Sequence, residues 1–235
     1  MNLRGFKLLI MLFLVIFLTA FSMFKNGERK IDFNGINYLD SNFNFTSVES
    51  VNKLLKQIDS VTLILVKRDL NLRKLEKIIN DNVFIDSSEV SLNLDGEIGV
   101  KIIEKEPVFR VLVGKYYIDS RGSKMPLSKI YSEKTPLIIS KVDSIYFDDL
   151  GFLGSYIKND NFLSNHISGL EIIDGEFNFY VNNFSYKIKI KDSYDFEVCF
   201  NNYKAFYKSV KKDSILAQLI SVNLNFKNQV IIQNK

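Results

Sequence analysis

The chain has 235 residues, 46% of them hydrophobic, which is enough for one large domain or two small ones with ordinary cores. Its 31 Lys and Arg against 27 Asp and Glu give a net charge of +4, spread along the chain, so nucleic-acid binding is not indicated. One Cys and one His exclude a disulfide framework and leave too few ligands for a zinc site. We expect no cofactor and no small-molecule substrate.

The strongest signal near the N-terminus is an apolar run from 8 to 24 that contains no charged residue. As a helix rising roughly 1.5 Å per residue, the run is about 25 Å long, close to the hydrocarbon thickness of a bilayer. Ala20-Phe21-Ser22 has the small-x-small form of a signal-peptidase site, but Met23 and Phe24 continue the apolar run beyond it. We therefore predict an uncleaved transmembrane helix.

The predicted orientation places residues 1–7 in the cytoplasm and everything after residue 25 on the far side of the membrane. The charges that flank the apolar run are nearly balanced, so they do not decide the orientation. Long domains, however, are translocated largely regardless of their charge. The sequence thus predicts a single-pass protein with an exported C-terminal part.

Residues 25–111 have the pattern of a small α+β module. A short strand is expected near 29–33. An amphipathic helix follows over 48–58, opened by a possible capping box at Thr46-x-x-Glu49, and a second helix covers 72–79. Each helix carries one apolar stripe, which must be buried against another element.

The region after these helices changes to a period of two. Apolar residues alternate with polar ones over 90–102 on both sides of a turn at Asp95-Gly96, which predicts a β-hairpin with one apolar face. We expect the two helices to cover that face, and the segment 34–44 to be a loop. Strand, helix, helix, strand, strand is the element order of a POTRA module.

The stretch from 100 to 128 reads as a junction between two modules. Glu104 is expected at the rim of the apolar hairpin face, and Pro107 removes a ladder donor and should end regular pairing. The chain restarts in extended form over 108–113, and Asp119 to Gly122 reads as a turn between two further strands.

The second module, predicted over 112–235, is mostly β with flanking helices. A short buried strand is expected at 137–139 and a helix over 150–157, capped by Asp148 or Asp149. A second hairpin is expected over 177–190. The cleanest helical face in the chain follows, formed by Tyr203, Phe206, Tyr207 and Val210.

The last segment alternates over about thirteen residues, more than twice the usual strand length of about five or six. One face is predicted to carry Ile220, Val222, Leu224, Phe226, Asn228, Val230 and Ile232. Such a strand can extend beyond its neighbour and expose an unpaired edge, which a fold either covers or uses to receive a partner strand.

Three segments resemble the bacterial cell-division family FtsQ/DivIB. "VSLNLDGEIGVKIIEKEPVFRV" resembles the family's closing POTRA hairpin with its E-x-x-P ending, here Glu104 and Pro107. "YYIDSRGSKMPLS" resembles its D-x-x-G-x-x-x-P motif, here Asp119, Gly122 and Pro126. "NLNFKNQVIIQNK" resembles its C-terminal strand. The resemblance implies an α+β chain with an N-terminal transmembrane helix, a POTRA-like module and a mostly antiparallel β-sheet module with flanking helices.

The resemblance also implies a function. The chain would be a non-enzymatic, single-pass scaffold of the inner membrane at the division site. Its exported domains would lie in the periplasm and recruit FtsB- and FtsL-like bitopic proteins, with Phe226 and Tyr207 as the main anchors. The residues expected to contact the partner are Tyr203, Phe206, Tyr207, Val222, Leu224, Phe226, Asn228, Gln229, Val230, Ile231 and Ile232.

Two enzymatic alternatives have some residues in their favour. A membrane-anchored, sortase-like thiol enzyme would use Cys199 and His166, but no Arg follows Arg121 and no Thr flanks the Cys. We expect instead a buried Cys in a strand and a His in a loop. A POTRA-type envelope chaperone or binding module is a further alternative, which is not enzymatic.

Paired carboxylates for general acid and base catalysis could be Glu104 with Glu106, or Asp148 with Asp149. No substrate-positioning motif accompanies either pair, and carboxylates at the rim of a sheet are usually solvated. We therefore predict that the chain is not an enzyme.

Overall fold

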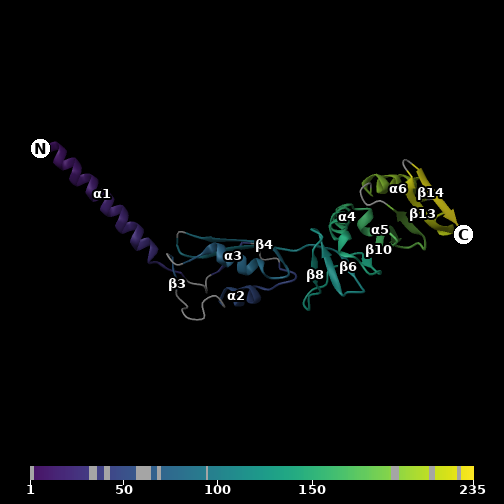
Figure 1. Cartoon of the computed structure of the whole chain (residues 1–235), viewed down its shortest axis with the longest axis horizontal. Helices are drawn as coiled ribbons and strands as arrows, with labels where there is room; N and C mark the ends of the chain where they lie inside the picture. The colour runs from purple at the N-terminus through teal and green to yellow at the C-terminus, as the bar shows by residue number, and fades with distance from the viewer. Residues whose placement is uncertain are drawn as a thin grey trace. The chain divides into compact units, whose positions relative to one another are not determined.

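The computed structural model describes residues 3–31, 36–39, 43–56, 65–67, 70–93, 95–191, 196–211, 215–226 and 229–235. The chain forms two compact units, Met1–Glu104 and Lys105–Lys235 (Figure 1), and its mixed helices and strands confirm the predicted α+β class. The units divide one strand earlier than the predicted boundary after residue 111. The reason is that 107–111 pairs within the sheet of the second unit.

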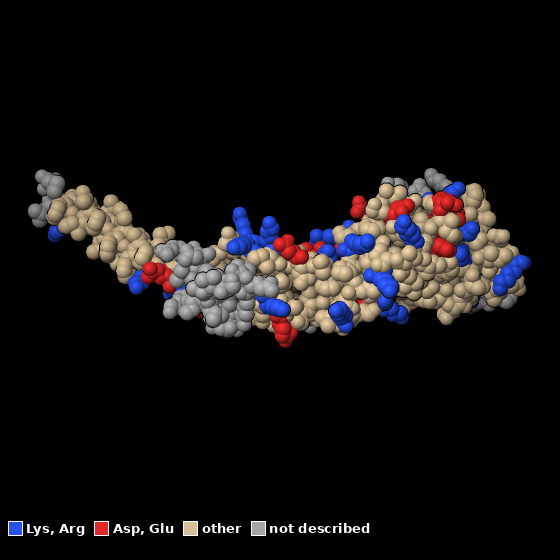
Figure 2. All heavy atoms as spheres, turned by 60° about the horizontal axis from the view of Figure 1, so that its bottom comes forward, with Lys and Arg blue, Asp and Glu red and all other residues tan. Residues whose placement is uncertain are grey.

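The N-terminal helix α1 (Leu3–Gly27) contains the whole predicted span. Its segment Gly5–Gly27 has a mean hydropathy of 2.4 in its most apolar window, and it is the only helix in the described part of the chain that is long and apolar enough to cross a membrane. Figure 2 shows this helix as an uncharged surface between its two ends. On the face of the molecule seen there, Lys and Arg are interspersed with Asp and Glu elsewhere.

In the described part of the first unit, two helices and five strands follow α1. They are β1 (Lys30–Ile31), β2 (Asn37–Tyr38), α2 (Val48–Lys56), β3 (Leu65–Val66), α3 (Leu72–Asn80), β4 (Ile85–Leu92) and β5 (Ile98–Glu104). The predicted helices and hairpin are therefore present. The assumed loop 34–44 contains a strand, β2, which pairs in parallel with β5, and β1 pairs with β3. Ile58 and Leu94, at the ends of the predicted patterns, lie outside the described residues.

The core of the first unit forms between the helices and the hairpin. Val51 and Leu55 of α2 and Leu75 and Ile79 of α3 are buried together with the alternating residues of β4 and β5. Burial of one apolar stripe per helix against one apolar sheet face is the packing that the two periodicities predict.

Glu104, the last residue of β5, anchors the segment that leads into α2. Its carboxylate accepts hydrogen bonds from the backbone N–H groups of Asn44 (2.9 Å), Phe45 (3.1 Å) and Thr46 (2.7 Å), and from the Thr46 hydroxyl (2.6 Å). The Thr46 hydroxyl is thus engaged by Glu104, and Ser47 and Ser50 hold the start of α2 reciprocally instead. The first part of the E-x-x-P ending is therefore structural.

The second unit is built on one sheet of nine strands. Their order is β14-β13-β12-β11-β10-β9-β6-β7-β8, and the pairings are antiparallel except β6 with β9, β9 with β10, and β12 with β13. The strands are β6 (Pro107–Val111), β7 (Tyr116–Asp119), β8 (Lys124–Pro126), β9 (Leu137–Ile138), β10 (Ile167–Ile173), β11 (Glu176–Val181), β12 (Lys187–Ile190), β13 (Leu219–Phe226) and β14 (Gln229–Asn234). Pro107 opens a paired strand, whereas the sequence suggested that it ends one.

Four α-helices accompany this sheet: α4 (Phe147–Asn159), α5 (Leu163–His166), α6 (Phe196–Val210) and α7 (Ile215–Gln218). They share one buried core with the inward residues of β6 and β9 to β13. Asp148 and Asp149 lie in the first turn of α4, where negative charge suits the helix dipole, and Tyr146 occupies the capping position.

The D-x-x-G turn fixes the start of α4 against the sheet. The buried carboxylate of Asp119 accepts from the N–H groups of Arg121 (3.0 Å) and Ser123 (2.7 Å). Gly122 has a φ of +73°, and a Cβ placed there would lie 2.5 Å from the carbonyl oxygen of Phe147. Only glycine combines this backbone conformation with so close an approach.

A polar, aromatic network lies in the core beneath α6. The imidazole of His166 lies 2.5 Å from the hydroxyl of Tyr203, which in turn lies 2.7 Å from the hydroxyl of Tyr186. Phe162 stacks on His166 and Tyr207 contacts it edge to face. Burial lowers the pKa of His166 to about 4, so the imidazole is neutral at pH 7.

Glu104→Ala should lower the stability of the first unit by about 2 to 3 kcal/mol, because it removes a charged acceptor from three backbone N–H groups. Glu106→Ala is the matched control: that carboxylate is exposed and pairs only with Lys158 at 2.9 Å, so its loss should cost less than about 0.5 kcal/mol. Thermal unfolding of the full chain in detergent measures both. Equal effects of the two changes would refute the anchoring role.

Stability should fall as the pH drops from about 6.5 toward 4. In that window unfolded His166 binds a proton that the folded imidazole excludes, which amounts to about 2 to 3 kcal/mol at pH 4.5. His166→Gln should remove this part of the acid sensitivity. Protonation of carboxylates should destabilise the wild type and the variant equally. Unfolding midpoints at pH 7 and 4.5 test it, and parallel losses in the two proteins would show that the buried imidazole does not matter.

Candidate functional site

The final alternating segment forms a hairpin of two strands, and the prediction of one continuous strand is wrong. β13 and β14 pair antiparallel, with Val222 opposite Ile232 and Asn223 opposite Ile231. The alternation runs in phase through both strands, so periodicity alone gave no sign of the reversal. Asn228, which was expected to contact the partner, lies outside the described residues.

β14 is the last strand of the sheet, and in the described part of the chain nothing pairs with its outer side. Both irregularities of the hairpin insert the extra residue into β13, so β14 itself is a regular strand. The N–H of Lys235 donates to the Gln218 carbonyl (2.9 Å), so the backbone groups of Lys235 point toward β13. Because the backbone groups of successive residues in a strand point to opposite sides, the N–H and C=O groups of Val230, Ile232 and Asn234 point to the open side.

The two ends of the sheet differ in how they treat an unpaired edge. At the far end, β8 has only three residues and contains both Lys124 and Pro126, two of the features that block strand pairing. By contrast, β14 has six residues, QVIIQN, with no proline and no charge. Of the two edges, β14 is the one that can accept another strand.

The predicted contact residues fall into three groups by exposure. Tyr203, Val222 and Leu224 are buried in the core, so they can support the edge but cannot touch a partner. A second group is half-buried and packs on the core from α6 and β14: Phe206, Tyr207, Val230 and Ile232. The exposed group is Gln229, Phe226 (49% exposed) and Ile231 (44% exposed).

The structure brings α6 and the C-terminal hairpin together, because α6 packs on both β13 and β14. Periodicity indicated the apolar face of α6 and the apolar residues of the last strands, but it missed the open face of the hairpin. That face has a hollow of about 460 Å³, lined in part by Ile220 and Gln233 of the hairpin and by Lys187 and Lys189 of β12. The side chains of a strand added to β14 would face α6, which is apolar, on one side of the sheet and the polar open face of the hairpin on the other.

The geometry does not support thiol catalysis. Cys199 is buried on α6, not in a strand, and its thiol donates to the carbonyl of Leu224 (3.4 Å). His166 ends α5, not a loop, and its imidazole pairs with Tyr203. The predicted strand for Cys199 and loop for His166 were wrong; Cys199 is buried as expected, and His166 is buried as well. A nucleophilic thiolate needs an accessible site and an imidazole that accepts its proton.

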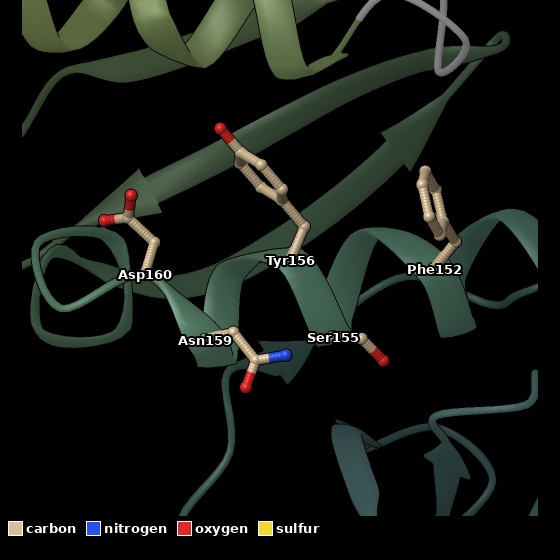
Figure 3. A pocket seen from close by; sticks show the side chains of 5 residues that line it. All are labelled: Phe152, Ser155, Tyr156, Asn159 and Asp160. Atoms are coloured by element: carbon tan, nitrogen blue, oxygen red, sulfur yellow. The ribbon is translucent and has the colours of Figure 1, made fainter.

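A hollow of about 340 Å³ along α4 offers no better site for catalysis. Figure 3 shows Phe152, Tyr156 and Asp160 on one side of the helix, with Ser155 and Asn159 on the other. Lys204 donates to Asp160 (2.8 Å), and the aromatic rings of Phe152 and Tyr156 pack edge to face on Phe196. These contacts join α4 to α6.

Asp160 has a structural role at this junction. Burial raises the pKa of its carboxyl, but hydrogen bonds from Lys204 and from the N–H groups of Leu163 and Phe162 outweigh that effect and leave the pKa below its ordinary value. Glu104 and Glu106 do not act as a pair. The Glu104 carboxylate accepts from backbone N–H groups of 44–46, and Glu106 forms an ion pair with Lys158. No cluster of three metal-binding side chains occurs among the residues that the structure describes.

Comparison with known proteins identifies the family. The family described as FtsQ/DivIB, C-terminal related, matches residues 106–232, more than half of the chain. The chain is also similar to the major extracytoplasmic domain of the trans isomer of the cell-division protein DivIB from Geobacillus stearothermophilus. That likeness covers 47% of this chain and 98% of the other at 10% identity and a TM-score of 0.36, so it carries no argument. No curated protein matches. The family match confirms the resemblance seen in the sequence: the chain belongs to the FtsQ/DivIB family of bacterial cell-division proteins.

Proposed function

We propose that this protein is a non-enzymatic scaffold of the division machinery that recruits bitopic, FtsB- and FtsL-like partners during septum formation. The partner would add a strand to the open side of β14. The observation that carries the proposal is the regular, uncharged edge of β14 beside the half-buried apolar face of α6. Family membership gives the division context.

The mechanism follows from the geometry of the edge. An added strand gains main-chain hydrogen bonds to Val230, Ile232 and Asn234, while its alternate side chains meet two different surfaces. Toward α6 they approach the apolar side of that helix, which packs on both β13 and β14 and supports an apolar anchor in the partner. Toward the open face they meet Ile231, whose side chain is exposed. The main chain supplies affinity and the two surfaces select the partner and its register.

Helix α1 supports a position in the membrane. Its length and hydropathy suit a single membrane span. We infer a short cytoplasmic N-terminus, an inner-membrane anchor, and two periplasmic units held at the division site. A POTRA-type binding role for the first unit is the second candidate function, favoured by its two helices packed on a hairpin.

The edge is tested by comparing Ile232→Pro with Ile232→Ala in the full-length protein. Both changes remove the side chain, but only proline removes the N–H on the open side, and neither removes a hydrogen bond to β13. Tagged protein is purified from its own membranes and co-purifying proteins are identified by mass spectrometry. We expect small single-pass partners with wild type and with Ile232→Ala, and at least a tenfold loss with Ile232→Pro.

Folding is controlled by circular dichroism and by the unfolding midpoint, which should be similar in the two variants. If Ile232→Pro is folded and retains the same partners, strand addition at β14 is wrong. If the wild type brings down no division protein, the scaffold function itself fails.

A further inference from the structure

A separate cleft of about 580 Å³ opens in the second unit where β9 and β10 diverge. The two strands pair only at Gly169 with Leu137 and at Leu170 with Ile138. The residue before Leu137 is paired with β6, because the N–H of Arg110 donates to the Pro136 carbonyl (3.0 Å). The sheet is therefore split at the amino ends of β9 and β10. Within the described residues, the β10 backbone before Gly169 has no strand partner on this side.

Arg110 places a positive charge in this cleft. It shares one row of the sheet with Leu137 and Gly169. Its guanidinium lies 5.9 Å from the ring centre of Tyr117 and makes one long hydrogen bond, 3.4 Å, to the Ser132 hydroxyl. No carboxylate among the described residues forms an ion pair with it, so most of its five N–H donors face no protein acceptor.

The rest of the lining is polar and contains one unsatisfied group. The Oγ1 atom of Thr135 is buried and has no hydrogen-bond partner among the described residues, a situation that costs about 1 to 3 kcal/mol unless something else satisfies the group. Residues with hydroxyl and amide side chains also line the cleft: Ser132, Ser164, Asn165, Ser168 and Asn182. A ligand with oxygen atoms suits such a lining.

The charge balance favours an anion. Glu133 also lines the cleft, but its carboxylate accepts from the Tyr131 hydroxyl (2.6 Å) and lies 4.0 Å from the Lys158 ammonium. Lys134 adds an exposed positive charge at the rim. The planar guanidinium matches the two oxygens of a carboxylate, and the volume exceeds that of a lone ion.

We propose that this cleft captures the C-terminal carboxylate of an extended peptide. Arg110 would bind the carboxylate, Thr135 would bond to one of its oxygens, and the unpaired β10 backbone would bond to the peptide main chain. The site lies on the far side of β11, β12 and β13 from the β14 edge. It therefore adds a second partner contact that does not depend on strand addition at β14.

The experiment uses acetyl-tetraalanine with a free carboxylate, the same peptide as its C-terminal amide, and glucuronate as a carboxylate without a peptide chain. Binding to the full-length protein in detergent is measured by isothermal titration. The free acid should bind at least about tenfold more tightly than the amide and than glucuronate. Arg110→Gln should weaken binding of the acid at least about tenfold, and Thr135→Val about threefold or more. The control Lys208→Gln removes an exposed cation that does not line the cleft, and it should change binding less than about twofold.

Thr135→Val is nearly isosteric and keeps the test decisive if Arg110→Gln fails to fold. Equal binding of acid and amide, or no binding up to about 10 mM, would overturn the carboxylate site. Equal binding of glucuronate and the peptide acid would overturn the peptide part of the proposal.

Discussion

The unpaired backbone of a terminal strand is the constraint on which this account depends. Every sheet that does not close leaves two such edges, and each must be blocked, covered or used. Here β8 is short and contains Lys124 and Pro126, whereas β14 carries six residues without charge or proline. The aromatic core beneath α6 holds that edge in place, since α6 packs on β13 and β14 and its Tyr203 is tied to His166 and Tyr186.

This arrangement agrees with the scaffold role that we propose. Titratable groups that suggested catalysis are committed to structure: Glu104 to three backbone N–H groups, His166 to Tyr203, and Cys199 to a carbonyl of β13. FtsQ/DivIB is a non-enzymatic family, which agrees with that pattern. The polar groups that remain uncommitted, on the outer side of β14 and at Arg110, are suited to binding.

Much of the fold could be predicted because the local patterns were strong. The stripes in α2, α3 and α4 and the hairpins β4–β5 and β11–β12 follow directly from periodicity. The reversal between β13 and β14 could not, because Phe226 and Val230 fall in the same phase of the alternation. Periodicity also could not separate Val222, which is buried, from Phe226, which lies in the same phase and is exposed, since that depends on which element covers each residue. Arg110 and Thr135 gave no sequence signal, because the cleft arises from the divergence of β9 from β10.

Hydrogen–deuterium exchange on the protein with and without its co-purified partner tests the central claim most directly. Strand addition predicts that the amides of Val230, Ile232 and Asn234 exchange much more slowly in the complex, while amides of the opposite edge, β8, do not change. If the partner binds and those three amides exchange at the same rate as in the free protein, the open side of β14 is not the binding edge and the proposed mechanism is wrong.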